Sequence, residues 1–221
     1  MTTDRVVLLH GIIRRASSMS PVESALRRKG YVTLNVDYPS TRHTLEEIAE
    51  IVHPAIEAFN VDNPGALHFV THSMGGLVTR VYLAAHRPAN LGRVVMMAPP
   101  NQGSEVADLL RRFGAYKRLM GPAGQQLATR AASKLPVPDC PVGVIAGTRS
   151  VYPLASFFLP GENDGRVSVK RTRITPEGPY ISVNAPHPTI MRHKGVHAAV
   201  ESFLATGAFP VGPISAPAAA R

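Results

Sequence analysis

Six short apolar runs recur along the chain, and their spacing limits the fold more than any other feature of the sequence. They occupy residues 6–10, 31–36, 66–71, 93–98, 141–147 and 179–184. Several of them are continuous rather than alternating, which is typical of strands buried on both faces of a parallel sheet. Helical patterns lie between the runs, so strand and helix alternate. The sequence therefore predicts an α/β fold, a doubly wound, mostly parallel six-stranded sheet with helices on both faces.

Four amphipathic stretches are the expected helices. Residues 20–23, SPVE, match a capping box and predict a helix that stops at Gly30. Thr44 is expected to cap a second helix that reaches residue 59, in which Pro54 should cause a kink or trim the start. Apolar stripes at helical spacing predict two more helices, at residues 74–86 and at roughly 190–206.

The chain is expected to form one domain over residues 1–207. Residues 99–138 form the longest stretch between two runs, and we expect a short helical flap there rather than a large cap. A Pro/Ala-rich tail, residues 208–221, follows the domain, and we expect its end to be disordered.

Charge and cysteine content exclude several classes of protein. The net charge is +9, but the basic residues are scattered as pairs and triplets, without the interleaved aromatic side chains that stack on bases. We therefore expect no nucleic-acid partner, and only a mild attraction to anionic surfaces or substrates. The single cysteine, Cys140, excludes an internal disulfide framework and Cys-rich zinc sites, and it suits a reducing compartment.

Hydropathy gives an expectation for location. No apolar stretch approaches the length of a membrane span, and the first apolar run is too short for a signal peptide. We expect a cytoplasmic protein without integral membrane association, unless a leader has been removed. The sequence does not indicate the oligomeric state.

The stretch LHFVTHSMGG, residues 67–76, carries the clearest functional signal. An apolar run ends at Thr71, and Ser73 follows with Gly75 and Gly76 directly behind it. Sites in parallel α/β sheets form beyond the carboxyl ends of the strands. The pattern matches the nucleophile elbow G-x-S-x-G except that Thr71 replaces the first glycine, so some crowding is expected. The alternative is a serine in an ordinary strand-to-helix turn.

The end of the first run, LHGI at residues 9–12, adds a resemblance to the α/β-hydrolase superfamily, whose oxyanion loop commonly begins with His-Gly. The resemblance spans nearly the whole chain and looks closest to small bacterial lipases and esterases without a large lid. It implies that the backbone N–H groups of Ile12 and Met74 are the oxyanion donors, and that no metal or organic cofactor is required. The ring of His10 is expected to pack or hydrogen-bond structurally.

A reactive serine needs a base, and nine histidines are present. The superfamily places this histidine on the loop after the last strand, where only His187 fits, between two prolines. His193 and His197 are spaced i, i+4 on the final helix, but with no third ligand in sequence reach they are expected at the solvated surface. His72 adjoins the serine, and its side chain should project to the opposite side of the strand and serve in packing.

The acid that orients the histidine is assigned by position. Asp164 follows the fifth run by a loop, and the Asp-Gly before a valine-containing stretch resembles the acid loop of small lipases. Its neighbour Glu162 is an alternative. Glu105 and Asp108, after the fourth run, occupy a second place where such hydrolases sometimes keep the acid. Alternatively, Asp164 could serve only to form the Asp-Gly turn in which it lies.

Two loops supply candidate substrate-binding residues. The loop after the fifth run contains Leu154, Phe157 and Phe158, which could line an apolar acyl pocket. Ile13 and Met19, beside Ile12, are candidates from the first loop. Some of these side chains could equally fill the core beneath the loops.

These residues together predict acyl transfer through Ser73, His187 and Asp164. The expected activity is hydrolysis of carboxylic esters with short to medium acyl chains, in small molecules or at the surface of a lipid aggregate or polyester. The same triad would serve an acyltransferase or a thioesterase. A catalytically silent hydrolase fold used for binding is the alternative from a different class.

Overall fold

The computed structural model describes residues 3–151, 159 and 161–210. Six strands form one sheet in the order β2-β1-β3-β4-β5-β6, and each neighbouring pair is parallel. The strands are β1 (Arg5–Leu9), β2 (Val32–Val36), β3 (Leu67–His72), β4 (Leu91–Met97), β5 (Val142–Gly147) and β6 (Tyr180–Val183). Each strand lies within two residues of a predicted run at both ends. The strand order reverses direction at β1 and β3, so this is the doubly wound sheet that the sequence predicts.

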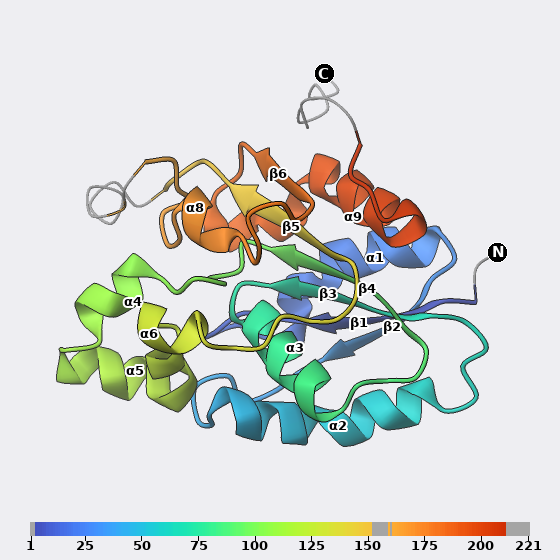
Figure 1. Ribbon diagram of the computed structural model, residues 1–221, viewed down its shortest axis with the longest axis horizontal. Coiled ribbons are helices and arrows are strands. Elements are labelled where there is room, and N and C mark those ends of the chain that lie inside the picture. Colours follow the sequence, from blue (N-terminus) through green and yellow to red (C-terminus); the bar gives the residue numbers. More distant parts are fainter. Residues whose placement is uncertain (1–2, 152–158, 160, 211–221) are drawn as a thin grey trace.

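Helices cover both faces of the sheet (Figure 1). On one face lie α1 (Ser20–Arg28) and α9 (Lys194–Thr206), and on the other lie α2 (Leu45–Asn60) and α3 (Met74–Ala85). The side chains of β1 alternate between two hydrophobic clusters. Val6 and Leu8 pack with the first pair of helices, while Val7 and Leu9 pack with the second. This burial on both faces is the reason that the first run is continuously apolar.

Of the two helix N-caps expected from the sequence, the structure confirms Thr44 and not Ser20. Thr44 is the N-cap of α2, and its hydroxyl and the Glu47 carboxylate form a full capping box. The predicted box at residues 20–23 is wrong. A short 3-10 helix, η1 (Ala16–Met19), precedes α1, so Met19 is the N-cap and Ser20 is already helical. The expectation for Pro54 is also corrected in part, because α2 starts nine residues before it and continues past it.

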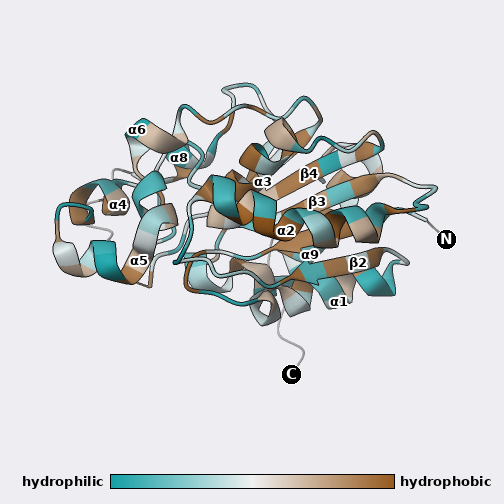
Figure 2. Ribbon diagram, turned by 90° about the horizontal axis from the view of Figure 1, so that it is seen from below, coloured by the Kyte–Doolittle hydropathy of each residue, from teal (hydrophilic) through white to brown (hydrophobic). Residues whose placement is uncertain are grey.

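The segment after β4 contains three helices, α4 (Glu105–Leu110), α5 (Gly114–Gln126) and α6 (Thr129–Ala132). Figure 2 shows them together at one end of the molecule, beside the sheet rather than on its faces. A break in α5 at Gly121, where φ is 62°, presses the backbone against the Thr41 carbonyl. A Cβ at this position would lie only 1.6 Å from the Thr41 oxygen, so glycine is required for this contact.

Arg80 of α3 holds both ends of this segment. Its side chain is buried, and its Nε and Nη1 donate to the carbonyl oxygens of Pro136 and Asn101 at 2.9 and 3.0 Å. Its Nη2 donates to the Leu135 carbonyl. Burial lowers the pKa of this guanidinium to about 10. Arg80, in the helix that follows Ser73, therefore holds the two ends of the α4–α6 segment close together.

The last described residues, up to Pro210, remain in contact with the domain. The ring of Phe209 lies 4.8 Å from that of Phe203 in α9, between their centroids. The rest of the expected disordered tail, residues 211–221, lies outside the described residues. Within the described ranges, no helix combines the length and the apolar character needed to cross a bilayer.

Candidate active site

Ser73 lies on a sharp turn between β3 and α3. Its φ of 53° and ψ of −123° are accessible to glycine but strained for a serine. Gly75 allows α3 to begin close to β1, because a Cβ there would lie 2.4 Å from the Leu9 carbonyl oxygen. The buried strand and the strained turn thus present the serine hydroxyl at the carboxyl edge of the sheet, as in a nucleophile elbow.

The threonine that replaces the first glycine of the elbow is accommodated. Thr71 is fully buried, and its Oγ1 has no hydrogen-bond partner among the described residues. A Cβ on Gly76 would lie 3.4 Å from this Oγ1 and 3.2 Å from the Cβ of Pro99. Glycine at position 76 thus avoids a tight contact with Pro99, whereas 3.4 Å from the Thr71 hydroxyl is an ordinary contact distance.

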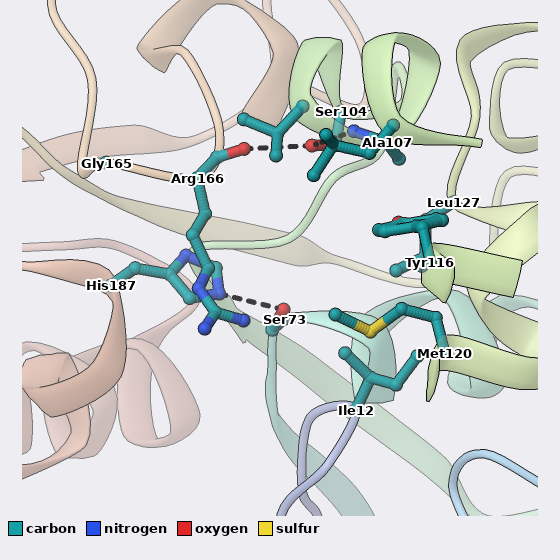
Figure 3. Close-up of a pocket in the computed structure, with 12 residues that line it drawn as sticks. Ile12, Ser73, Ser104, Ala107, Tyr116, Met120, Leu127, Gly165, Arg166 and His187 are labelled. Atoms are coloured by element: carbon teal, nitrogen blue, oxygen red, sulfur yellow. Dashed lines mark hydrogen bonds between the residues drawn. The ribbon is translucent and has the colours of Figure 1, made fainter. Parts of the chain in front are cut away.

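Three side chains form a continuous series of hydrogen bonds. The Ser73 Oγ lies 2.9 Å from His187 Nε2, and His187 Nδ1 lies 2.7 Å from Asp164 Oδ2 (Figure 3 shows the first of these). A carboxylate can only accept, so Nδ1 carries the proton and Nε2 is left to accept from the serine hydroxyl. All three residues are buried. The structure thus brings together the serine, histidine and aspartate that the sequence selects.

Asp164 is held by its own loop. Its Oδ1 accepts from the backbone N–H groups of Arg166 and Val167 at 3.0 and 2.9 Å, which leaves Oδ2 for the histidine. Its carbonyl oxygen accepts from the N–H of His187 at 3.1 Å. Gly147 ends β5 beside this loop, and a Cβ there would lie 2.8 Å from the Asp164 Cβ. Backbone contacts therefore fix the carboxylate and the histidine relative to each other.

The alternative acids have other partners. Glu105 Oε1 accepts from Ser168 Oγ at 2.6 Å and from Arg171 Nε at 2.9 Å. Asp108 Oδ1 accepts from the N–H of Thr129 at 3.0 Å. Glu162 is exposed. None of the three is bonded to His187 in the described part of the chain, so Asp164 is the acid that the geometry places beside the imidazole.

His72 is more than the packing residue that the sequence predicts, because its side chain hydrogen-bonds to the loop that carries His187. Its Nε2 donates to the His187 carbonyl at 3.0 Å, and the two rings lie 5.0 Å apart between centroids. Burial holds the pKa of His72 well below its usual value, and the nearby His187 lowers it further. Its Nδ1 is buried without a partner among the described residues. A neutral His72 therefore supports the backbone that carries the imidazole of His187.

His10 plays the structural role expected of it. Its ring stacks on Tyr38 at 4.0 Å between centroids, and its Nδ1 donates to the Gly11 carbonyl at 2.9 Å. Burial lowers the pKa of its imidazole.

Two backbone N–H groups beside Ser73 have no acceptor within the described ranges, those of Ile12 and Met74. Met74 is the first residue of α3, where a helix leaves its N–H groups unpaired. The next N–H in the first loop, that of Ile13, donates instead to Ser40 Oγ at 3.0 Å. The two N–H groups that the resemblance selects are thus available to a ligand.

A pocket of about 220 Å³ opens beside Ser73 and His187. Apolar side chains of the α4–α6 segment form one wall, and Ile12 forms part of another (Figure 3). The lining residues from that segment are Ser104, Val106, Ala107, Leu110, Tyr116, Met120 and Leu127. The pocket thus lies between the elbow and the helices after β4.

Two of the expected substrate-binding residues are corrected. Met19 is fully buried in the core beneath α1 and α9, on the other face of the sheet, and does not line the pocket. Ile13 is 49% exposed and lines a neighbouring hollow instead. The remaining candidates, Leu154, Phe157 and Phe158, lie outside the described residues.

Arg166 and the lining of α4 and α5 were not found from the sequence. Figure 3 shows the Arg166 side chain extending past the His187 ring toward Ser73. Its carbonyl accepts from Ser104 Oγ at 2.9 Å, which ties the loop of Asp164 to the start of α4. The length of residues 99–138 was enough to predict a helical flap, but not to predict which of its side chains face Ser73.

The described residues gather no group of three His, Cys, Asp or Glu side chains that could hold a metal ion. His197 Nε2, one of the two histidines considered for such a role, donates to the Met191 carbonyl at 2.8 Å. The reactive groups at this edge of the sheet are the hydroxyl of Ser73, the imidazole of His187 and the carboxylate of Asp164.

The doubly wound sheet and the hydrogen-bonded serine at its carboxyl edge define a protein of the α/β-hydrolase class. A model of the alpha/beta hydrolase family matches residues 6–211, and the chain belongs to this family. No curated protein matches the sequence.

Solved structures with a similar fold include a lipase, a phospholipase and a carboxyl esterase. The mature form of Bacillus licheniformis lipase BlEst2 has a TM-score of 0.76 at 19% identity, over 91% of this chain and 90% of that chain. Phospholipase PlaB from Legionella pneumophila has a TM-score of 0.66 at 17% identity, over 93% and 57%. The metagenomic carboxyl esterase MGS0156 has a TM-score of 0.66 at 22% identity, over 84% and 64%. At these identities the likeness establishes the shared fold.

Proposed function

We propose that this protein is a serine hydrolase that cleaves carboxylic esters with short to medium acyl chains. The observation that carries the proposal is the buried series Ser73–His187–Asp164, with hydrogen bonds of 2.9 and 2.7 Å, beside two unpaired N–H groups. The resemblance of the fold to lipases and esterases supports the same class of reaction. A pocket of about 220 Å³ supports the acyl length, because pockets that enclose drug-sized ligands measure roughly 300–1,000 Å³.

The mechanism follows from the proton positions. Ser73 Oγ attacks the ester carbonyl carbon while His187 Nε2 takes the hydroxyl proton. Asp164 keeps the Nδ1 proton in place and stabilises the imidazolium, while the N–H groups of Ile12 and Met74 bind the oxyanion. The imidazolium then protonates the leaving alcohol, and an acyl-Ser73 ester remains. Water, deprotonated by the same Nε2, attacks this ester, and the imidazolium returns the proton to Ser73 Oγ as the acid is released. Loss of one oxyanion donor typically costs about 3–4 kcal/mol in the barrier.

A fluorophosphonate probe followed by intact-mass measurement tests the chemistry. We expect one adduct on the parent chain and none on Ser73→Ala, whose esterase activity should fall by about 10⁴-fold or more. Absence of an adduct on a folded parent chain would mean a silent hydrolase fold used for binding.

A panel of p-nitrophenyl esters of increasing chain length, with competing alcohols, amines and thioesters, separates the remaining candidates. We expect hydrolysis to peak at short to medium acyl chains. Preferential transfer to an added acceptor, or preference for thioesters, would instead favour an acyltransferase or a thioesterase with the same triad.

A further inference from the structure

A second hollow lies next to the pocket, and the same two segments form the wall between them. In the first loop, Ile12 lines the pocket while Ile13 lines the hollow. In α5, Met120 lines the pocket while Leu119 lines the hollow. Leu119 is 61% exposed, so apolar surface extends from the mouth of the pocket toward solvent.

Basic residues line this hollow and also precede Leu119 in the sequence of α5. Arg15 and Arg42 line the hollow and are exposed, and Lys117 and Arg118 are exposed just before Leu119. We call these four cations, with Ile13 and Leu119, the basic lip. Asp37 also lines the hollow, and its Oδ1 accepts from the Ala16 N–H at 2.9 Å.

The charge of the lip is not balanced locally. Over residues 109–138 the sequence has six basic residues and no acid. No carboxylate of the described residues lies within 4.0 Å of the cation of Arg15, Arg42, Lys117 or Arg118. Several cations elsewhere are paired, as Lys29 is with Glu201 at 2.8 Å.

The basic surface continues along the flap. At the turn between α4 and α5, Arg111 and Arg112 are exposed beside Phe113, which is 51% exposed. The guanidinium carbon of Arg112 lies 5.4 Å from the centre of the Phe113 ring. The flap therefore presents apolar side chains flanked by cations, a pattern typical of surfaces that lie in a lipid–water interface.

We propose that the basic lip docks this protein onto an anionic lipid bilayer and thereby presents the pocket to acyl esters in that bilayer. The proposal rests on the proposed function and narrows its substrate class. Anionic headgroups complement the unpaired cations, and the acyl region of the bilayer accepts the apolar side chains of Ile13 and Leu119. A nucleic-acid backbone or a soluble acidic ligand has no apolar region to receive these two side chains. Docking at the lip places the mouth of the pocket at the headgroup level.

Vesicle sedimentation with the full-length Ser73→Ala chain measures the docking without hydrolysis. We expect binding to vesicles of phosphatidylcholine mixed with phosphatidylglycerol, weak binding to phosphatidylcholine alone, and loss of binding at high salt. Each cation removed should weaken binding about fivefold, so the double variant Lys117→Gln/Arg118→Gln should bind about 25-fold more weakly. Leu119→Gln should also weaken binding to the anionic vesicles.

Arg28→Gln is the matched control. Arg28 is exposed and has no carboxylate partner among the described residues, and it ends α1 at the opposite, amino edge of the sheet. Binding that Arg28→Gln weakens about fivefold, as much as is expected for each cation of the lip, would mean a general charge effect and would overturn the proposal. Equal binding to neutral vesicles, or capture of duplex DNA without capture of vesicles, would also overturn it.

Hydrolysis of soluble p-nitrophenyl butyrate separates this proposal from the proposed function. In a chain with Ser73 intact, the lip variants should keep this activity while losing activity on esters in anionic vesicles. Vesicle binding by a chain that cannot cleave the soluble ester would refute the hydrolase and leave the docking standing. Cleavage of the soluble ester without vesicle binding would refute the docking alone.

Discussion

Ser73 has a φ of 53°, where a side chain strains the backbone, and the same turn lifts its hydroxyl toward His187. Strained non-glycine conformations of this kind cost on the order of 1–3 kcal/mol and persist when the surroundings fix them. Here the surroundings are a buried strand before the serine and the packing of α3 against β1 at Gly75. The elbow therefore stores a small cost in stability at the residue proposed to react.

Ser73→Gly and Ser73→Ala should reveal this strain. Both variants lose the hydrogen bond to His187 and the activity, but only glycine relaxes the backbone. We expect Ser73→Gly to have a free energy of unfolding about 1–2 kcal/mol higher than Ser73→Ala. At Ser133, whose φ is −66°, the order should reverse or vanish. Urea denaturation of the four variants measures both differences, and the same order at both positions would contradict a strained elbow.

His72 should position His187 rather than react. In His72→Phe the buried His187 carbonyl loses its donor, so we expect a loss of about 1–3 kcal/mol in stability and a fall in kcat with little change in KM. His72→Gln keeps an N–H donor and should recover part of kcat. Steady-state kinetics on a soluble ester, with a urea titration, tests both. A purely packing residue would lower stability in both variants and leave kcat of the folded enzyme unchanged.

The sequence could select Ser73, His187 and Asp164 because each follows an expected strand, and strand ends converge at one edge of a parallel sheet. The resemblance to α/β-hydrolases supplied the order of serine, acid and histidine along the chain. It could not reveal the contact of His72, because strand alternation gives a direction for the side chain but not the loop that packs against it. Met19 was misplaced for a related reason. Apolar residues in a loop look alike in sequence whether they line a pocket or enter the core.

At the scale of helices, two similar sequence patterns have different structures. Residues 20–23 and 44–47 both read as a hydroxyl residue followed three positions later by glutamate. At Thr44 the chain is extended before the helix, so the hydroxyl reaches the N–H of Glu47 at 3.2 Å. At Ser20 the preceding 3-10 helix already turns the chain, and Glu23 instead pairs with Arg27 at 2.7 Å. The cap thus depends on the backbone before it, which the motif does not specify.

Thr44→Ala and Ser20→Ala form a matched pair that tests this difference. Loss of the Thr44 cap should reduce the free energy of unfolding by about 1 kcal/mol. Ser20→Ala should be neutral within about 0.5 kcal/mol, because its side chain caps nothing and alanine favours a helix. Thermal or urea unfolding measures both changes. Equal losses in the two variants would contradict the assignment of a single capping box.

Strands β1 and β5 were predictable because burial on both faces makes their sequences continuously apolar, as in VVLL of β1. The α4–α6 segment was predictable only as a helical flap. Its helices are short, and α5 is interrupted at Gly121, where the backbone contact with Thr41 sets the geometry. A contact between segments eighty residues apart leaves no local signal, so the wall of the pocket could not be read from the pattern.

At the scale of the whole molecule, three buried histidines couple stability to pH. Burial lowers the pKa of His10, His68 and His72 in the folded chain. Below about pH 6.5 the unfolded chain therefore binds more protons than the folded chain does, so the free energy of unfolding falls with falling pH. Each histidine contributes up to about 1.4 kcal/mol per pH unit, between its unfolded pKa and its lower folded value.

His68 allows this coupling to be tested away from the proposed active site, because it is the second residue of β3, at the end of the strand opposite Ser73, and lies beside Asp4 and Arg93. We expect the urea midpoint to be nearly constant between about pH 7.5 and 8.5 and to fall between about 6.5 and 5. His68→Gln removes one of the three titrations, so its unfolding free energy should fall less steeply over the acidic range, even if the variant is less stable at neutral pH. The comparison of slopes is independent of that offset. A parent chain whose stability rises on acidification, or a variant with an unchanged slope, would show that protons bind to His68 equally in both states and that other groups control the acid unfolding.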